Sequence, residues 1–93
     1  MIRKWVIVMI SFEEREKITN DINFISNMGW MNQYFEEIGY PYITSADETE
    51  DKGNVCFSDM DQNSVVVNYK ITGKDRYGFD VVEVEDIEFC EAV

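Results

Sequence analysis

The chain has no histidine, a single proline and only eight basic residues, against nineteen acidic ones. Without histidine, the side chain most often used for acid–base catalysis near neutral pH is missing, and Ser-His and Cys-His nucleophile pairs are excluded. The two cysteines, Cys56 and Cys90, cannot form a structural zinc site without further ligands. We expect both thiols to be reduced and packed, and we expect no enzymatic activity, metal or cofactor.

Long hydrophobic runs are lacking as well. The apolar run over residues 5–10 is shorter than a signal-peptide core and far shorter than the ~20 residues of a membrane span. A cytoplasmic protein is therefore expected. With 93 residues, of which 45% are hydrophobic, the chain predicts one domain over 1–93. Because the core of such a domain is thin, a homodimer that buries more apolar surface is also expected.

Most of the acidic excess falls in two blocks. Residues 36–63 carry eight acids and one lysine, and residues 80–91 carry six acids and no basic residue. A net charge of −11 repels nucleic acids and anionic membranes and attracts basic partners. The sequence therefore predicts a protein partner with a basic surface.

The hydrophobic pattern predicts an α+β fold with an N-terminal strand, two helices and then a three-stranded antiparallel meander. Residues 2–10 are β-branched and aromatic, which favours a buried strand, with an extension of the following helix as the alternative. A helix is predicted over 12–28, because Ser11 stands at capping-box spacing from Glu14, and Gly29 is typical of a helix C-terminus.

The second half of the chain predicts mostly strands. A short helix over 30–38 should end at Gly39 and be followed by an extended segment before a polar, acidic loop over 45–54. Alternating apolar residues then predict the strands of the meander. Their expected ranges are 55–58, 64–72 and 77–89.

The last of these strands changes its hydrophobic phase. Val82 and Val84 share one parity, whereas Ile87 and Phe89 share the other, which predicts a bulge or bend near residues 85–86. On a plain parity count, Glu83 and Glu85 lie on one face of the strand, and Asp86 and Glu88 form a second pair on the other.

A calcium site is a possible interpretation of the segment that begins with Asp59, Asp61 and Asn63. Ser64 stands where a calcium loop requires glycine, and Lys70 where it requires a bidentate glutamate. The segment therefore favours an ordinary Asp/Asn-rich turn.

The aromatic residues Trp30, Tyr34, Tyr40 and Tyr42 are open to two interpretations. Tyrosine and tryptophan anchor many protein interfaces, and they are also common core residues in small domains. The core is favoured for Trp30 and Tyr34, whereas the pattern decides neither way for Tyr40 and Tyr42.

Acidic residues on a strand can imitate a nucleic-acid backbone. Residues two apart on a strand are ~6.8 Å apart, and two nucleotides of one DNA strand advance by a similar distance. The candidate partner-binding residues are the acids of the last strand and those of residues 36–51. They are Asp80, Glu83, Glu85, Asp86, Glu88, Glu91, Asp47, Glu48, Glu50, Asp51, Glu36 and Glu37.

The predicted helix over 11–28 and the acidic stretches 47–51 and 80–91 together resemble the DNA-mimic inhibitors of phages, in particular the Arn-type anti-restriction proteins. This resemblance implies a homodimer, in an infected bacterial host, whose carboxylates occupy the DNA-binding surface of a restriction endonuclease of the McrBC type. Anti-CRISPR proteins are similar in size and charge. The alternative function is a small regulatory adaptor that binds a protein through apolar surface around Tyr40 and Tyr42.

Overall fold

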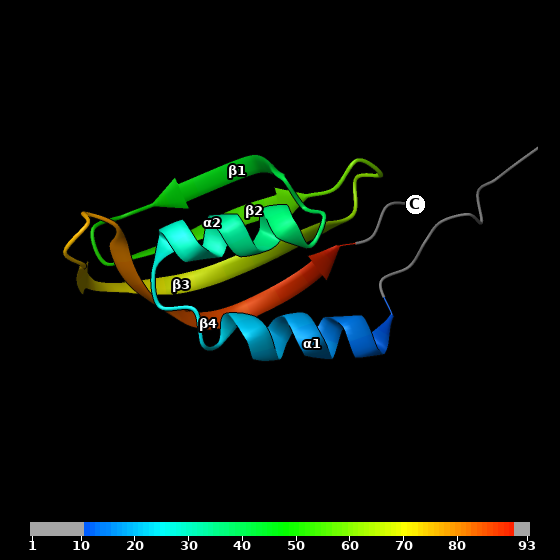
Figure 1. Cartoon of the computed structure of the whole chain (residues 1–93). Coiled ribbons are helices and arrows are strands. Elements are labelled where there is room, and N and C mark those ends of the chain that lie inside the picture. Colours follow the sequence, from blue (N-terminus) through cyan, green and yellow to red (C-terminus); the bar gives the residue numbers. More distant parts are fainter. Residues whose placement is uncertain (1–10, 91–93) are drawn as a thin grey trace, which may run out of the picture.

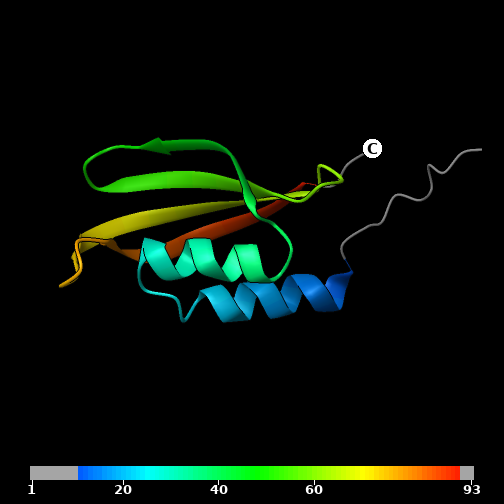
Figure 2. The ribbon, with the colours of Figure 1, turned by 45° about the horizontal axis from the view of Figure 1, so that its top comes forward.

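The computed structural model describes residues 11–90, which form two helices followed by a four-stranded antiparallel sheet (Figure 1). Each strand pairs with the next along the chain, in the order β1-β2-β3-β4. Both helices lie on one face of the sheet (Figure 2), and no other described segment covers the opposite face. The elements are α1 (Phe12–Ile22), α2 (Met28–Glu37), β1 (Tyr42–Glu48), β2 (Lys52–Ser58), β3 (Ser64–Lys74) and β4 (Asp80–Cys90).

The predicted arrangement of strands is wrong, although the chain does combine helices with an antiparallel sheet. The sheet has four strands rather than three, and all of them follow α2. The N-terminal strand predicted over 2–10 lies outside the described residues and is not among these four. The additional strand is β1, which together with the start of β2 replaces the loop predicted over 45–54. All seven residues of β1 are exposed. An edge strand exposed on both faces has no apolar alternation by which it could be recognised.

The first helix begins as predicted. Ser11 is its N-cap, and the Ser11 hydroxyl accepts a 3.1 Å hydrogen bond from the backbone N–H of Glu14. The helix ends at Ile22, well before the predicted residue 28, because the following segment hydrogen-bonds to the sheet instead. The carbonyl of Ser26 accepts a 2.8 Å hydrogen bond from the N–H of Val82 on β4.

The second helix starts earlier than predicted. Asn27 caps it by accepting a 2.8 Å hydrogen bond from the N–H of Trp30. Gly29, predicted as the end of the first helix, therefore lies in the first turn of the second.

The end of α2 confirms the prediction for Gly39, whose φ of 102° is left-handed. Its N–H bonds to the carbonyl of Glu36, and the N–H of Tyr40 bonds to the carbonyl of Phe35 at 2.7 Å. This is a Schellman motif, which satisfies carbonyls that the helix end would otherwise leave unpaired.

The core fills the space between the helices and the sheet. Phe35 of α2 stacks on Phe57 of β2, with their ring centroids 4.3 Å apart. The predicted alternation of β3 is confirmed, since its inward-facing residues are Val65, Val67, Tyr69 and the half-buried Ile71. Fully burying one such large side chain contributes about 1.5–3 kcal/mol. The buried hydrophobic residues are Ile18, Ile22, Met31, Phe35, Tyr40, Val55, Phe57, Val65, Val67, Tyr69 and Val82.

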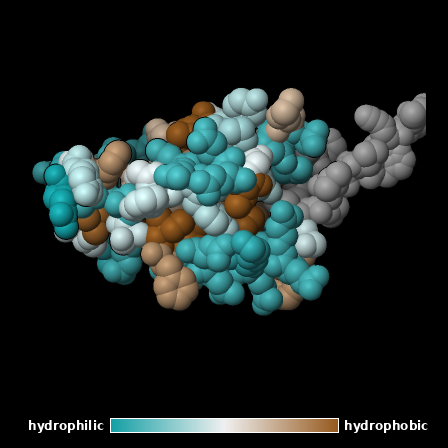
Figure 3. Space-filling model, viewed as in Figure 1, coloured by the Kyte–Doolittle hydropathy of each residue, from teal (hydrophilic) through white to brown (hydrophobic). Residues whose placement is uncertain are grey.

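Seen from the helix side, hydrophilic residues cover most of the surface, with hydrophobic residues emerging between them (Figure 3). No helix within residues 11–90 is long and apolar enough to cross a membrane.

Candidate partner-binding face

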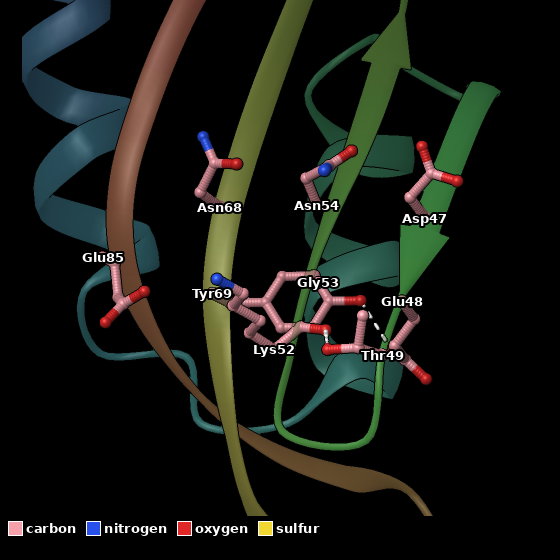
Figure 4. Close-up of a pocket in the computed structure, with 9 residues that line it drawn as sticks. All are labelled: Asp47, Glu48, Thr49, Lys52, Gly53, Asn54, Asn68, Tyr69 and Glu85. Atoms are coloured by element: carbon pink, nitrogen blue, oxygen red, sulfur yellow. Dashed lines mark hydrogen bonds between the residues drawn. The ribbon is translucent and has the colours of Figure 1, made fainter.

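The face of the sheet away from the helices carries a polar row that crosses all four strands. Asn68 of β3 pairs with Asn54 of β2 and with Asp86 of β4, and Asn54 pairs with Asp47 of β1. Residues paired across neighbouring strands point to the same face of a sheet. Figure 4 shows Asp47, Asn54 and Asn68 in this row. The row thus places a carboxylate at each edge of the sheet and two amides between them.

The bulge predicted in the last strand is confirmed. Asn68 pairs with Asp86, and the next residue, Tyr69, pairs with Val84, so that Glu85 is the extra residue on β4. Val84 pairs with Tyr69, and Ile87 pairs with Val67, and both of these β3 residues face the helices. The two phases of the apolar pattern therefore belong to one face of β4.

This bulge corrects the predicted distribution of the β4 acids. Glu83 pairs with Lys70, and Glu88 lies opposite Val66, so both share the helix-free face with Asp86. The carboxylate of Glu85 is 3.8 Å from the ammonium of Lys70, which places it on the same face. The prediction of two pairs on opposite faces is wrong, because the bulge brings all four carboxylates into one exposed row.

The first and last acids of this stretch stand apart from the row. The carboxylate of Asp80 lies 2.8 Å from the ammonium of Lys74, and this hydrogen bond raises the pKa of Lys74. Much of the charge of Asp80 is therefore balanced within the protein. Glu91 lies outside the described residues.

The acids near β1 are divided between two faces and a turn. Asp47 lies on the helix-free face, whereas Glu48 accepts a 2.8 Å hydrogen bond from the hydroxyl of the buried Tyr69. Burial of the ring, followed by this hydrogen bond, raises the pKa of Tyr69. Glu50 and Asp51 are exposed in the turn between β1 and β2. They extend the acidic edge beyond Asp47.

The acids of α2 do not join this face. Glu36 and Glu37 are exposed in the last turn of the helix, on the helix side of the sheet. Glu37 accepts a 3.1 Å hydrogen bond from the amide of Gln33. The structure thus brings Asp47 and four acids of β4 onto one face and leaves the two helix acids outside it. The four acids are Glu83, Glu85, Asp86 and Glu88.

A hollow of about 530 Å³ lies along this face near the turn between β1 and β2 (Figure 4). Asn54 and Asn68 contribute to its lining, with the carboxylates of Asp47 and Glu85 and the ammonium of Lys52 around it. Such a hollow offers hydrogen-bond acceptors to a cationic side chain. Within residues 11–90, no group of three or more acidic or cysteine side chains is placed to hold a metal ion.

The segment considered as a calcium loop is a turn, as predicted. One carboxylate oxygen of Asp59 accepts hydrogen bonds from the N–H groups of Asp61 and Asn63, at 2.8 and 2.9 Å. The other accepts a 3.1 Å hydrogen bond from the side-chain amide of Asn63. The carboxylate of Asp59 is therefore engaged within the turn.

The aromatic residues follow the sequence interpretation only in part. Tyr40 is buried and unavailable to a partner, whereas Tyr42 is about half exposed. Tyr34 is half-buried and hydrogen-bonds to Asp21 at 2.8 Å. The core position expected for Trp30 is wrong, because its side chain is 61% exposed.

A second exposed aromatic group was not foreseen from the sequence. Tyr77 and Phe79 project from the turn between β3 and β4, close to Trp30. Trp30 also lines a second hollow, which includes the exposed Phe24. The available signal was the pair of aromatic residues around Gly78, in a segment otherwise typical of a hairpin turn.

The two cysteines are free thiols. Cys56 is half-buried on the helix-free face, and Cys90 is exposed at the end of β4, which contradicts the expectation that both are packed.

No known protein-family model matches this chain, and comparison with curated proteins and with solved structures gave no match.

Proposed function

We propose that this protein is a DNA-mimic inhibitor whose helix-free face occupies the basic DNA-binding surface of a host defence protein such as a restriction endonuclease. The observation that carries this proposal is the bulge at Glu85. It aligns the carboxylates of Glu83, Glu85, Asp86 and Glu88 along one exposed edge of the sheet. The target class and the homodimer implied by the resemblance to Arn-type proteins belong to the same proposal.

The dimensions of the face support mimicry of a duplex. Asp47 and Asp86 stand on strands separated by three inter-strand spacings of ~4.8 Å, or roughly 14 Å. This separation is comparable to the ~12 Å width of the DNA major groove. Along β4, Asp86 and Glu88 are ~6.8 Å apart, near the advance of two nucleotides on one strand.

The order of the carboxylates also supports the proposal. Their backbone is held in a paired strand, so binding costs less conformational entropy than it would for a disordered acidic tail. The net charge of −11 should steer the protein rapidly toward a basic surface, with an association rate that falls as salt rises.

The experiment that tests this function begins with the immobilised protein and a bacterial lysate at low salt. Bound proteins are eluted either with a salt gradient or with short duplex DNA. Mimicry requires that DNA-binding proteins elute with both. A partner that ignores duplex DNA at saturating concentration would contradict the proposal.

Matched variants then test the face itself against the captured target. Glu83→Gln, Asp86→Asn and Glu88→Gln together remove three charges from the helix-free face. A control with Glu13→Gln, Glu16→Gln and Asp61→Asn removes the same number from exposed positions elsewhere. We expect the first triple variant to lose affinity by at least tenfold more than the control. Equal losses would mean that net charge alone drives binding.

A further inference from the structure

Three aromatic side chains line a groove of about 260 Å³ at the end of the molecule where α2 begins. Trp30 comes from the first turn of α2, and Tyr77 and Phe79 come from the turn between β3 and β4. The side chains of Trp30 and Tyr77 are 61% and 76% exposed, and that of Phe79 is about half exposed. Large aromatic surface left open to water marks an interaction site in many soluble proteins.

The groove is held in place by hydrogen bonds. One oxygen of the Asp75 carboxylate accepts from the N–H groups of Tyr77 and Phe79, at 2.9 and 3.0 Å. The other accepts a 2.8 Å hydrogen bond from the amide of Asn27, just before α2. The turn that carries the two rings is thus tied directly to the start of the helix.

Gly29 allows the turn to approach the helix closely. A Cβ atom at this position would lie 3.2 Å from the ring of Phe79, tighter than an ordinary contact. The missing side chain lets this ring pack against the first turn of α2. The rings are therefore arranged before any ligand arrives, which lowers the entropic cost of binding.

The side chain of Gln33 offers a hydrogen-bond acceptor to a ligand in the groove. The Gln33 amide lies 3.1 Å from the Glu37 carboxylate, which can only accept, so the amide nitrogen must face Glu37. The carbonyl oxygen of Gln33 has no hydrogen-bond partner within residues 11–90. One N–H of the Asn27 amide donates to Asp75, and its oxygen accepts from the N–H of Trp30.

We propose that this groove binds an arginine side chain presented by a partner protein. A guanidinium group is flat, stacks on aromatic rings and can donate to the carbonyl oxygen of Gln33. The charge is complementary, because the protein carries a net −11 and Glu37 lies one turn beyond Gln33. Asp75 offsets the partial positive charge at the start of α2, which would otherwise repel a cation.

The chain's own Arg76 already makes this type of contact. Its guanidinium carbon lies 5.7 Å from the centroid of the Tyr77 ring, within the range of a cation–π interaction. The groove lies on the helix side, away from the carboxylates of β4. A change that abolishes binding at one of these two surfaces should therefore leave binding at the other intact.

The test uses a Trp5→Phe background, in which Trp30 is the only tryptophan. The probe is a short arginine–glycine peptide, and its control replaces arginine with citrulline, which has nearly the same shape but no charge. We expect a saturable change in Trp30 fluorescence with the arginine peptide alone. By calorimetry, Trp30→Leu and Tyr77→Leu should each weaken binding by about two- to fivefold. Phe12→Leu, an equally exposed aromatic position outside the groove, should leave the affinity unchanged.

A lysine–glycine peptide separates this site from the acidic face. Substitution of Glu83, Asp86 and Glu88 should weaken arginine and lysine peptides alike, whereas the groove variants should lower the preference for arginine. The proposal is overturned if the citrulline peptide binds equally well, or if Trp30→Leu leaves the affinity for arginine unchanged. It is also overturned if sedimentation shows a dimer that Trp30→Glu dissociates, because a second copy would then fill the groove.

Discussion

The hydroxyl of Tyr69 on β3 reaches across Gly53 on β2 and donates a 2.8 Å hydrogen bond to the carboxylate of Glu48 on β1. The three residues lie in one row of the sheet, on the side that faces the helices, and Figure 4 shows them together. The tyrosine side chain can span two strands only because the residue between them has no side chain. This contact ties the exposed edge strand β1 to the buried centre of the sheet.

Tyr69→Phe should lower the free energy of unfolding by about 1–2 kcal/mol at neutral pH, because a hydrogen bond to a carboxylate is lost. Urea unfolding followed by circular dichroism measures this, with Tyr42→Phe as a control on the exposed surface. An equal effect at Tyr42 would show that the hydrogen bond contributes nothing specific.

The same contact predicts how stability depends on alkaline pH. Burial and Glu48 raise the pKa of Tyr69 above its usual 10, so the folded protein keeps a proton that the unfolded chain loses. The contribution of Tyr69 to the free energy of unfolding is therefore fully present below pH 10 and decreases as the pH rises above that value. The free energy of unfolding of Tyr69→Phe should decline less steeply than that of the wild type in this range, and parallel curves would refute the assignment.

Gly53→Ala should destabilise the protein by about 1–3 kcal/mol, because overpacking a filled site forces neighbouring atoms to shift. The added Cβ would lie 2.6 Å from the hydroxyl oxygen of Tyr69 and 3.0 Å from the carbonyl of Asp47. Gly73→Ala is the matched control, since a Cβ there meets nothing within 4 Å. Thermal or urea unfolding of both variants gives the comparison. Similar losses at the two glycines would contradict the close approach of Tyr69.

Asp21 should contribute stability that acid removes. Hydrogen bonds from Lys17 and then Tyr34, both at 2.8 Å, hold the pKa of Asp21 below its usual 3.8. Its contribution is therefore present above pH 3.8 and is lost as the pH falls through the lower, folded value. The unfolding free energy of Asp21→Asn should fall less steeply between about pH 5 and pH 2 than that of the wild type. Asp61→Asn, a change in an exposed turn, serves as the control, and identical acid profiles for Asp21→Asn and the wild type would exclude the effect.

Local and buried features could be predicted from the sequence. Ser11 and Gly39 mark helix ends through their own backbone chemistry, and the alternation of β3 reflects a strand with one buried face. The position of the β4 bulge followed from the phase of its apolar residues. Each of these signals lies within a few residues of the structure that it specifies.

Features decided by tertiary position could not be predicted. Strand β1 is stabilised through its pairing with β2 and shows no inward-facing pattern of its own. Trp30 lies outside the core because Met31 and Phe35 face the sheet instead. The acids of the candidate face were identified from the sequence, but they were assigned to the wrong faces of β4. An alternation count assumes that every second residue points the same way, and the extra residue of a bulge shifts this alternation by one. Only the pairing with β3 resolves this.

Deletion of Glu85 tests that assignment directly. Without this residue, β4 alternates regularly, with Val84 and Ile87 inward and Glu83 and Asp86 outward, so the fold should persist. We expect the free energy of unfolding to change by no more than about 1 kcal/mol, since the removed residue is exposed. Deletion of Val84 should be far more costly, because it would turn a carboxylate toward the helices. Chemical unfolding of both deletion variants measures the difference, and the reverse order of stability would mean that Glu85 itself faces inward.

Asp75 joins the turn between β3 and β4 to the start of α2, and its loss should affect both stability and the aromatic groove. Asp75→Ala removes the acceptors of three hydrogen bonds and should cost about 1–3 kcal/mol in urea unfolding. Asp75→Asn keeps an oxygen for the N–H groups of Tyr77 and Phe79 but turns a donor toward the Asn27 amide, so it should cost less. If the turn positions the rings, the two variants should weaken binding of the arginine–glycine peptide in this same order. A loss of stability with unchanged peptide affinity would show that the groove does not depend on this turn, because the rings would then bind without being held in place.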